Sequence, residues 1–250
     1  MMKRTIFYLF LALTVFSCSE DSSSDKMMNP MANDGQGGSL ATFALKGDYL
    51  YVVDNNRLNV FDISEEGKPV KVNSVMVGFQ IETLFSHKDY LYIGSRNGMF
   101  IYSLDAPEQP VELSSVNHFT ACDPVVANDS LAFVTLHSNT NCGNGVNLLE
   151  IYDVTNVTQP QLITSKQLAM PKGLGLYGDY LFVCDNTIKV FDVSSPATSL
   201  KMVSSINNTA FDVIIRNNLL IAIGKSGLYQ YELRNDSTNL EIEELSSVEI

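Results

Sequence analysis

The chain has 250 residues, of which 45% are apolar and 18% are charged, and its formal net charge at pH 7 is −12. This length and this apolar content are enough for one globular domain with a hydrophobic core. The acidic excess, without a cluster of Lys and Arg, argues against nucleic acid as a partner and against direct adsorption to anionic lipid headgroups. Attachment to a membrane would therefore need a separate anchor.

Residues 1–17 have the pattern of a bacterial signal peptide. Lys3 and Arg4 form a short basic region, and an apolar run follows at residues 5–16. That run is too short for a membrane span, which needs about 20 residues. The letters VFSC, which end at Cys18, resemble the lipobox of bacterial lipoproteins. The resemblance implies that Cys18 begins the mature chain and carries acyl groups such as palmitate; the alternative is an ordinary signal peptide in which Cys18 is incidental.

Residues 18–38 are rich in Ser, Asp, Asn and Gly, which is typical of a flexible tether. Glu20 and Asp21 closely follow Cys18, and acidic residues in this place resemble the surface-export signal of some Gram-negative lipoproteins. The resemblance implies an outer-membrane lipoprotein that is exposed at the cell surface. A short acidic run also suits any solvated tether, so the periplasmic face of the membrane is the alternative.

From residue 39 to residue 250 the sequence repeats one unit five times, at intervals of about 40 residues. The clearest block is a turn followed by an apolar strand: GDYLYV at 47–52, KDYLYI at 88–93, NDSLAF at 128–133, GDYLFV at 178–183 and NNLLI at 217–221. A second apolar block follows each copy, then a strand that begins near Pro in most units. One more strand precedes each copy, so each unit has four strands.

This pattern predicts an all-β fold. Gly-Asp, Asn-Asp and Asn-Asn pairs tolerate the positive φ of a tight hairpin, and such hairpins make neighbouring strands antiparallel. The second strand is almost continuously apolar, which indicates burial of both its faces, and one sheet alone cannot achieve that. We therefore predict a β-propeller of five four-stranded antiparallel blades, at about 39–79, 80–119, 120–169, 170–208 and 209–250. The five blades either close one ring or form an incomplete ring that a second copy completes.

Copies of the second block also resemble a named family. FDIS at 61–64, YDVT at 152–155 and FDVSSP at 191–196 are similar to the core of LVIVD repeats, which occur in bacterial cell-surface propellers, mostly of unknown function. The copies at 102–105 and 231–233 depart from that motif. The resemblance therefore implies a propeller at the cell surface, and it brings no catalytic residues with it.

The interval between the third and fourth copies is longer and marks an insertion at residues 137–145. Insertions in one loop of a repeat protein are common sites of special function. Cys142 lies in this loop and Cys122 lies where the innermost strand of the same blade begins, so we predict that they are neighbours. An oxidising envelope favours a disulfide between them. The alternatives are a zinc site that adds His118 and His137, whose spacing matches no known compact ligand pattern, and unrelated free thiols.

Several conspicuous residues have structural interpretations. Three carboxylates precede Ser or Thr by two residues and suit a turn in which Asp accepts from the backbone, rather than a catalytic ring: Asp62, Asp153 and Asp192. Three tyrosines begin apolar strands and suit the core, with the hydroxyl reaching a turn, rather than a platform for sugars: Tyr49, Tyr90 and Tyr180. Cys184 lies within an apolar strand and suits a small buried hydrophobe.

The positions at which the innermost strands begin differ from blade to blade, whereas their neighbours stay apolar. Four of them are charged and would ring the mouth of the propeller axis: Glu82, Asp123, Lys172 and Asp212. We predict this face, together with His118 and His137, as a binding site; the alternative is a solvated rim without a ligand.

The sequence has three single His residues and no recognisable nucleophile motif, which argues against an enzyme. We expect a non-catalytic binding or interaction module, anchored through Cys18, with a protein or glycan partner and with no catalytic residue, metal or cofactor. The alternatives are a propeller hydrolase or lyase that uses carboxylates at the mouth, and a purely structural component of the envelope.

Overall fold

The structure is a computed structural model, and it describes residues 37–117, 124–137, 146–196, 200–236 and 239–249. These residues belong to one compact unit, Ala32–Ile250. All their regular structure is β, arranged as five antiparallel four-stranded sheets, so the predicted fold class and blade number are confirmed. None of the described residues forms a helix able to span a bilayer. The predicted signal peptide, Cys18 and the predicted tether up to residue 36 lie outside the described residues.

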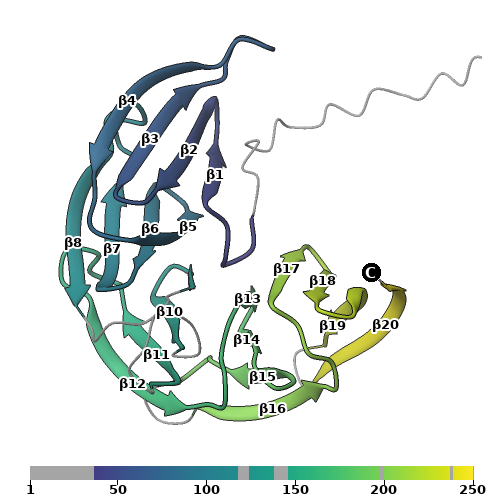
Figure 1. The fold of residues 1–250 in the computed structure, drawn as a ribbon. Coiled ribbons are helices and arrows are strands. Elements are labelled where there is room, and N and C mark those ends of the chain that lie inside the picture. Colours follow the sequence, from purple (N-terminus) through teal and green to yellow (C-terminus); the bar gives the residue numbers. More distant parts are fainter. Residues whose placement is uncertain (1–36, 118–123, 138–145, 197–199, 237–238, 250) are drawn as a thin grey trace, which may run out of the picture. The chain divides into compact units, whose positions relative to one another are not determined.

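Each sheet has its strands in chain order, with the first strand nearest the centre and the fourth at the periphery (Figure 1). Blade 1 consists of β1 (Phe43–Lys46), β2 (Tyr49–Asp54), β3 (Arg57–Asp62) and β4 (Val70–Met76). Blade 2 consists of β5 (Ile81–His87), β6 (Tyr90–Ser95), β7 (Gly98–Ser103) and β8 (Val111–Asn117). Blade 3 consists of β9 (Val125–Ala127), β10 (Leu131–Leu136), β11 (Leu148–Asp153) and β12 (Gln161–Gln167). Blade 4 consists of β13 (Leu174–Tyr177), β14 (Tyr180–Cys184), β15 (Ile188–Asp192) and β16 (Lys201–Ile206). Blade 5 consists of β17 (Asp212–Arg216), β18 (Leu219–Gly224), β19 (Gly227–Asn235) and β20 (Leu240–Glu249).

The first hairpin of four blades turns through one residue of positive φ, as the sequence predicts. These residues are Gly47 (55°), Lys88 (50°), Gly178 (55°) and Asn217 (53°). Blade 3 differs, because the Asn128 amide donates to the Leu131 carbonyl and the turn lies at Asp129 and Ser130. Ser130 therefore occupies the place of Asp48, and the sequence alignment, which put Asp129 there, is wrong by one residue in this blade.

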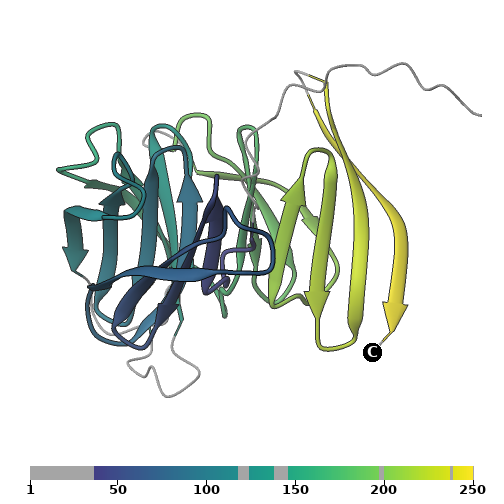
Figure 2. The ribbon, with the colours of Figure 1, turned by 90° about the horizontal axis from the view of Figure 1, so that it is seen from above.

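The sheets pack on one another in chain order, with the innermost strand of each blade against the preceding sheet. The predicted burial of both faces of the second strand is confirmed in the middle of the series. In β6, Leu91, Tyr92 and Ile93 expose at most 1% of their surface, and β10 and β14 are buried in the same way. Figure 2 shows the four strands of blade 5 side by side, with no other described strand in front of them.

Candidate functional site at the mouth of the axis

All five innermost strands begin at the same end of the axis, since every blade runs through its four antiparallel strands in the same order from the centre to the periphery. We call this end the mouth. Of the predicted site residues, Glu82, Lys172, Asp212 and the half-buried His137 are described. Four others lie outside the described residues, so the binding and disulfide predictions that involve them stay predictions: His118, Cys122, Asp123 and Cys142.

Asp212, the first residue of β17, is a buried charged residue at the mouth, with 9% of its surface exposed. Its Oδ1 accepts from the Ser39 hydroxyl at 3.0 Å and from the Val213 amide at 2.9 Å. Its Oδ2 accepts from the Leu40 amide at 3.2 Å. Burial raises the pKa of Asp212 to about 6, although these hydrogen bonds act in the opposite direction. The carboxylate is therefore held by the segment that precedes β1.

That segment crosses the mouth and joins four blades. The Ser39 hydroxyl, besides donating to Asp212, accepts from the Leu174 amide of blade 4 at 2.6 Å. The Ala41 carbonyl accepts from the Leu84 amide of blade 2 at 2.7 Å. Gly38 permits this route, because a Cβ there would lie 2.2 Å from Asp212 Oδ2. We call the Ser39–Asp212 contact and its backbone partners the mouth clamp; the sequence singled out Asp212 but not Ser39.

Lys172 of blade 4 lies beside the connection that leads to Asp212 of blade 5. The Gly173 amide donates to the Phe211 carbonyl at 2.9 Å, and Lys172 Nζ lies 4.8 Å from the centre of the Phe211 ring. Both charges influence the Cys184 thiol, which is fully buried. Burial raises the pKa of Cys184, Asp212 raises it further, and Lys172 lowers it. The interpretation of Cys184 as a buried hydrophobe is confirmed.

Glu82 has a partner within its own blade. Its Oε1 lies 3.5 Å from Arg96 Nε, and Arg96 also donates to the side chain of Gln80 at 3.0 Å. Burial raises the pKa of Glu82, and Arg96 lowers it. Phe79, in the same connection, is 65% exposed. The mouth therefore carries exposed apolar side chains beside its charges, and the sequence had not singled out Phe79.

The aspartates of the second block have the predicted turn role. Asp62 Oδ1 accepts from the Ser64 amide at 2.8 Å, and Asp153 and Asp192 accept from both the amide and the hydroxyl two residues later. Hydrogen bonds from Ser64 lower the pKa of Asp62, and the equivalent bonds lower the pKa of the other two carboxyls. These carboxylates are part of the fold rather than of a reactive site.

The tyrosine interpretation is confirmed only in part. Tyr49, Tyr90 and Tyr180 are half-buried rather than in the core. The Tyr49 hydroxyl does reach a turn, where it donates to Glu108 Oε1 at 3.0 Å.

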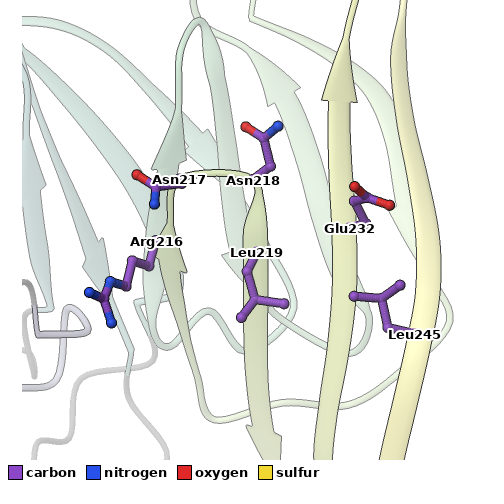
Figure 3. Close-up of a pocket in the computed structure, with 6 residues that line it drawn as sticks. All are labelled: Arg216, Asn217, Asn218, Leu219, Glu232 and Leu245. Carbon is purple, nitrogen blue, oxygen red and sulfur yellow. The ribbon is translucent and has the colours of Figure 1, made fainter. Parts of the chain in front are cut away.

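The opposite end of the axis has cavities that the sequence did not predict. One of about 300 Å³ lies between blades 2 and 3, where the side chains of His87 and Lys88 both contact Asp129 Oδ1, at 2.7 Å and 2.6 Å. A second of about 330 Å³ lies on blade 5 alone and is lined by Arg216, Asn217, Asn218, Leu219, Glu232 and Leu245 (Figure 3). Register places Arg216 and Asn217 at the positions of His87 and Lys88.

Comparison with known families agrees with the sequence pattern. The LVIVD repeat matches residues 37–77 and 171–208, which contain blade 1 and blade 4. Two of the five blades therefore match the LVIVD repeat, and the other three have the same four-stranded architecture. No curated protein sequence matches the chain.

Solved structures share the fold at low sequence identity. A functionally unknown protein from Desulfotomaculum acetoxidans matches with a TM-score of 0.67 and 11% identity, over 88% of this chain and 71% of that one. A protein from Lactobacillus plantarum matches with a TM-score of 0.64 and 14% identity, over 82% and 72%. The periplasmic gluconolactonase PpgL of Pseudomonas aeruginosa matches with a TM-score of 0.61 and 15% identity, over 82% and 68%. At these identities the likeness concerns the fold alone.

Proposed function

We propose that the chain is a lipid-anchored binding module at the bacterial cell surface, and that its propeller holds a protein or glycan ligand at the mouth. The observation that carries this proposal is a group of exposed apolar side chains on the connections around a fixed, hydrogen-bonded centre. Leu40 and Phe211 are each 39% exposed, and Phe79 is 65% exposed. Exposed aromatic side chains next to charges are typical of binding surfaces.

The carboxylates of the mouth favour binding over hydrolysis or elimination. A general acid or base must come within hydrogen-bond reach of its substrate. Both oxygens of Asp212 accept from the protein itself, and the carboxylate ties the start of the chain to blade 5. Glu82 faces Arg96. The described mouth carboxylates therefore have structural partners, whereas the apolar side chains are open to solvent.

The test uses two double variants of residues 32–250, the compact unit that contains all five sheets. The probes are arrays of bacterial surface polysaccharides and an extract of outer-surface proteins from the source cells. We expect the unchanged chain to bind one class, and Phe79→Ala with Phe211→Ala to lose at least about tenfold in affinity, since aromatic anchors dominate such surfaces. The control is Val72→Ala with Met202→Ala, on β4 and β16, where both side chains are exposed.

Equal losses in the two double variants would contradict a ligand at the mouth. Turnover of a sugar lactone by the unchanged chain, lost in Asp212→Asn, would replace binding by the hydrolase alternative. The anchor is tested separately, in cells fed labelled palmitate. Cys18→Ala is expected to abolish labelling and to release the protein from the membrane fraction, and protease treatment of intact cells distinguishes the surface from the periplasmic face.

A further inference from the structure

The first and last blades each have one apolar face that no sheet of the described residues covers. In β2 of blade 1, Tyr51 and Val53 pack toward blade 2 and expose at most 6% of their surface. Side chains alternate along a strand, so Leu50 and Val52 face the other way, and both are only half-buried. Phe43, on the same face of β1, is 52% exposed.

Blade 5 shows the complementary situation. In β18, Leu220 and Ala222 pack on blade 4 and are fully buried. On the opposite face, Ile223 is 43% exposed and Ile214 of β17 is 36% exposed. We call this the blade 5 face, and the surface of Phe43, Leu50 and Val52 the blade 1 face.

Equivalent positions in the other blades show what these faces lack. Register places Leu91 and Ile93 of blade 2 where blade 1 has Leu50 and Val52, and both are fully buried against blade 1. It places Cys184 of blade 4 where blade 5 has Ile223, and Cys184 is fully buried against blade 5. The two faces are therefore the two halves of the blade-to-blade contact that the chain forms internally.

We propose that the blade 5 face of one chain packs on the blade 1 face of a second copy. Each copy carries both the blade 1 face and the blade 5 face. The contact joins two different surfaces and is therefore heterologous. Two copies that each form this contact with the other make a closed dimer. The inference rests on the fold and is independent of the proposed ligand at the mouth.

Charge complementarity supports the choice of a second copy. In the cavity between blades 2 and 3, His87 and Lys88 face Asp129 and the β11–β12 turn, which contributes Thr155 and Val157. The cavity on blade 5 has Arg216 in the place of His87, and the residues that line it all belong to blade 5.

Blade 1 offers an acidic residue for the facing wall of this cavity. Register places its β3–β4 turn in the position of the β11–β12 turn, with Glu66 in the place of Val157 and Glu65 just before it. Both are exposed, and so is Arg216. Glu65 is paired with Lys68 of the same turn, so a second copy would bring the carboxylate of Glu66 toward Arg216 while it covers Ile214 and Ile223.

Sedimentation velocity of residues 32–250 over the micromolar range tests the proposal. We expect a concentration-dependent dimer, and we expect Ile223→Asp to raise the dissociation constant by at least about a hundredfold, because it places an unpaired charge in an apolar interface. The matched control is Leu162→Asp, on the outermost strand of blade 3, where Leu162 is 54% exposed. Far-UV circular dichroism verifies that each variant folds.

Charge reversal gives a second readout that does not depend on the core of the interface. Arg216→Glu is expected to weaken association about tenfold, and adding Glu66→Arg to restore most of it, since the repulsion is replaced by attraction. A monomer at all concentrations would overturn the proposal. In that case other residues of the chain, or a different partner, would cover the blade 1 face and the blade 5 face. Association that Ile223→Asp leaves unchanged would overturn it as well.

Discussion

Blades 2 to 4 and blades 1 and 5 are built from the same four-stranded unit, yet the same positions differ in burial between them. Leu91 of blade 2 is fully buried, whereas Leu50, its equivalent in blade 1, is half-buried. The strand geometry is shared, down to the bulge between β3 and β4, which recurs at the equivalent place between the third and fourth strands of every blade. Burial in a repeat protein therefore depends on the neighbours of a unit more than on its own sequence.

The same comparison explains why the mouth clamp matters. Within the part of the chain that the structure describes, blade 5 has a neighbouring sheet on one side only, and blade 1 has one on the other side only. Ser39 and Leu40, which precede blade 1, bond to Asp212 of blade 5. The clamp thus joins the two ends of the series by hydrogen bonds where their faces do not meet.

The largest expected difference between a middle and a terminal blade is in the stability that an equivalent aspartate contributes to each. Asp185 of blade 4 has a fully buried side chain that accepts from Lys189 Nζ at 2.5 Å and from the amides of Ala169 and Met170. We expect Asp185→Ala to lower the free energy of unfolding by about 3–5 kcal/mol, because it leaves a cation and two amides without their acceptor.

Asp54 of blade 1 is the matched control for this change. Register makes it the equivalent of Asp185, and it bonds to Asn59, the equivalent of Lys189, but it is exposed. We expect Asp54→Ala to cost less than about 1 kcal/mol. Urea denaturation measures both variants, and similar costs would contradict the distinction between the blades.

A pair of leucines gives the next largest effect. Leu91→Ala removes a fully buried side chain from the contact between two sheets, and we expect it to cost about 3 kcal/mol. Leu50→Ala makes the same change at the half-buried equivalent in blade 1, with an expected cost of about 1 kcal/mol. Denaturation at protein concentrations below and above dimer formation sharpens the test. If a second copy covers the blade 1 face at high concentration, Leu50→Ala will lower the free energy of unfolding more there than at low concentration.

The mouth clamp predicts a dependence of stability on pH. The pKa of Asp212 is about 6 in the fold against 3.8 in the unfolded chain, because burial penalises the charged carboxylate. The folded state therefore binds the proton more tightly. Stability from this group is fully present below pH 3.8 and is lost as pH rises through about 6, with a change of up to about 3 kcal/mol.

Asp212→Asn removes the titration and keeps one acceptor for Ser39. We expect the free energy of unfolding of the unchanged chain to rise, relative to this variant, by about 1–2 kcal/mol when the pH falls from 7 to 5. Urea denaturation at the two values measures the difference. A difference that does not change with pH would show that Asp212 is not held as a buried carboxylate.

The fold was predictable because its signals are local. Pairs such as Gly47-Asp48 specify the hairpin, and apolar strands such as β6 and β14 specify burial on both faces. Blade 3 was misaligned by one residue because Asp129 and Ser130 both suit a turn, and only the bond from Asn128 to Leu131 distinguishes the registers.

The clamp was beyond the sequence for a different reason, and the sequence left open whether the five blades close one ring. Ser39 and Asp212 are far apart in the chain, and a hydrogen bond between distant residues leaves no periodic pattern. The apolar pattern of β18 is that of a fully packed strand, although one of its faces is open. One residue of blade 5 did indicate the open face. Gln230 of β19 stands where blade 4 has Val190 of β15, on the face that would meet a further blade.

The smallest predicted effect concerns a single hydroxyl between blades 1 and 2. The Tyr51 side chain is fully buried, and its hydroxyl donates to the Pro107 carbonyl of blade 2 at 2.9 Å. Blades 3 and 4 have Phe133 and Phe182 at the equivalent positions, so the ring alone satisfies the packing between two middle blades. We expect Tyr51→Phe to lower the free energy of unfolding by about 1 kcal/mol, since one hydrogen bond is lost and no cavity is created. A cost in urea denaturation as large as that of Leu91→Ala would mean that the terminal blade is held to its neighbour mainly by this bond rather than by the burial of its apolar face.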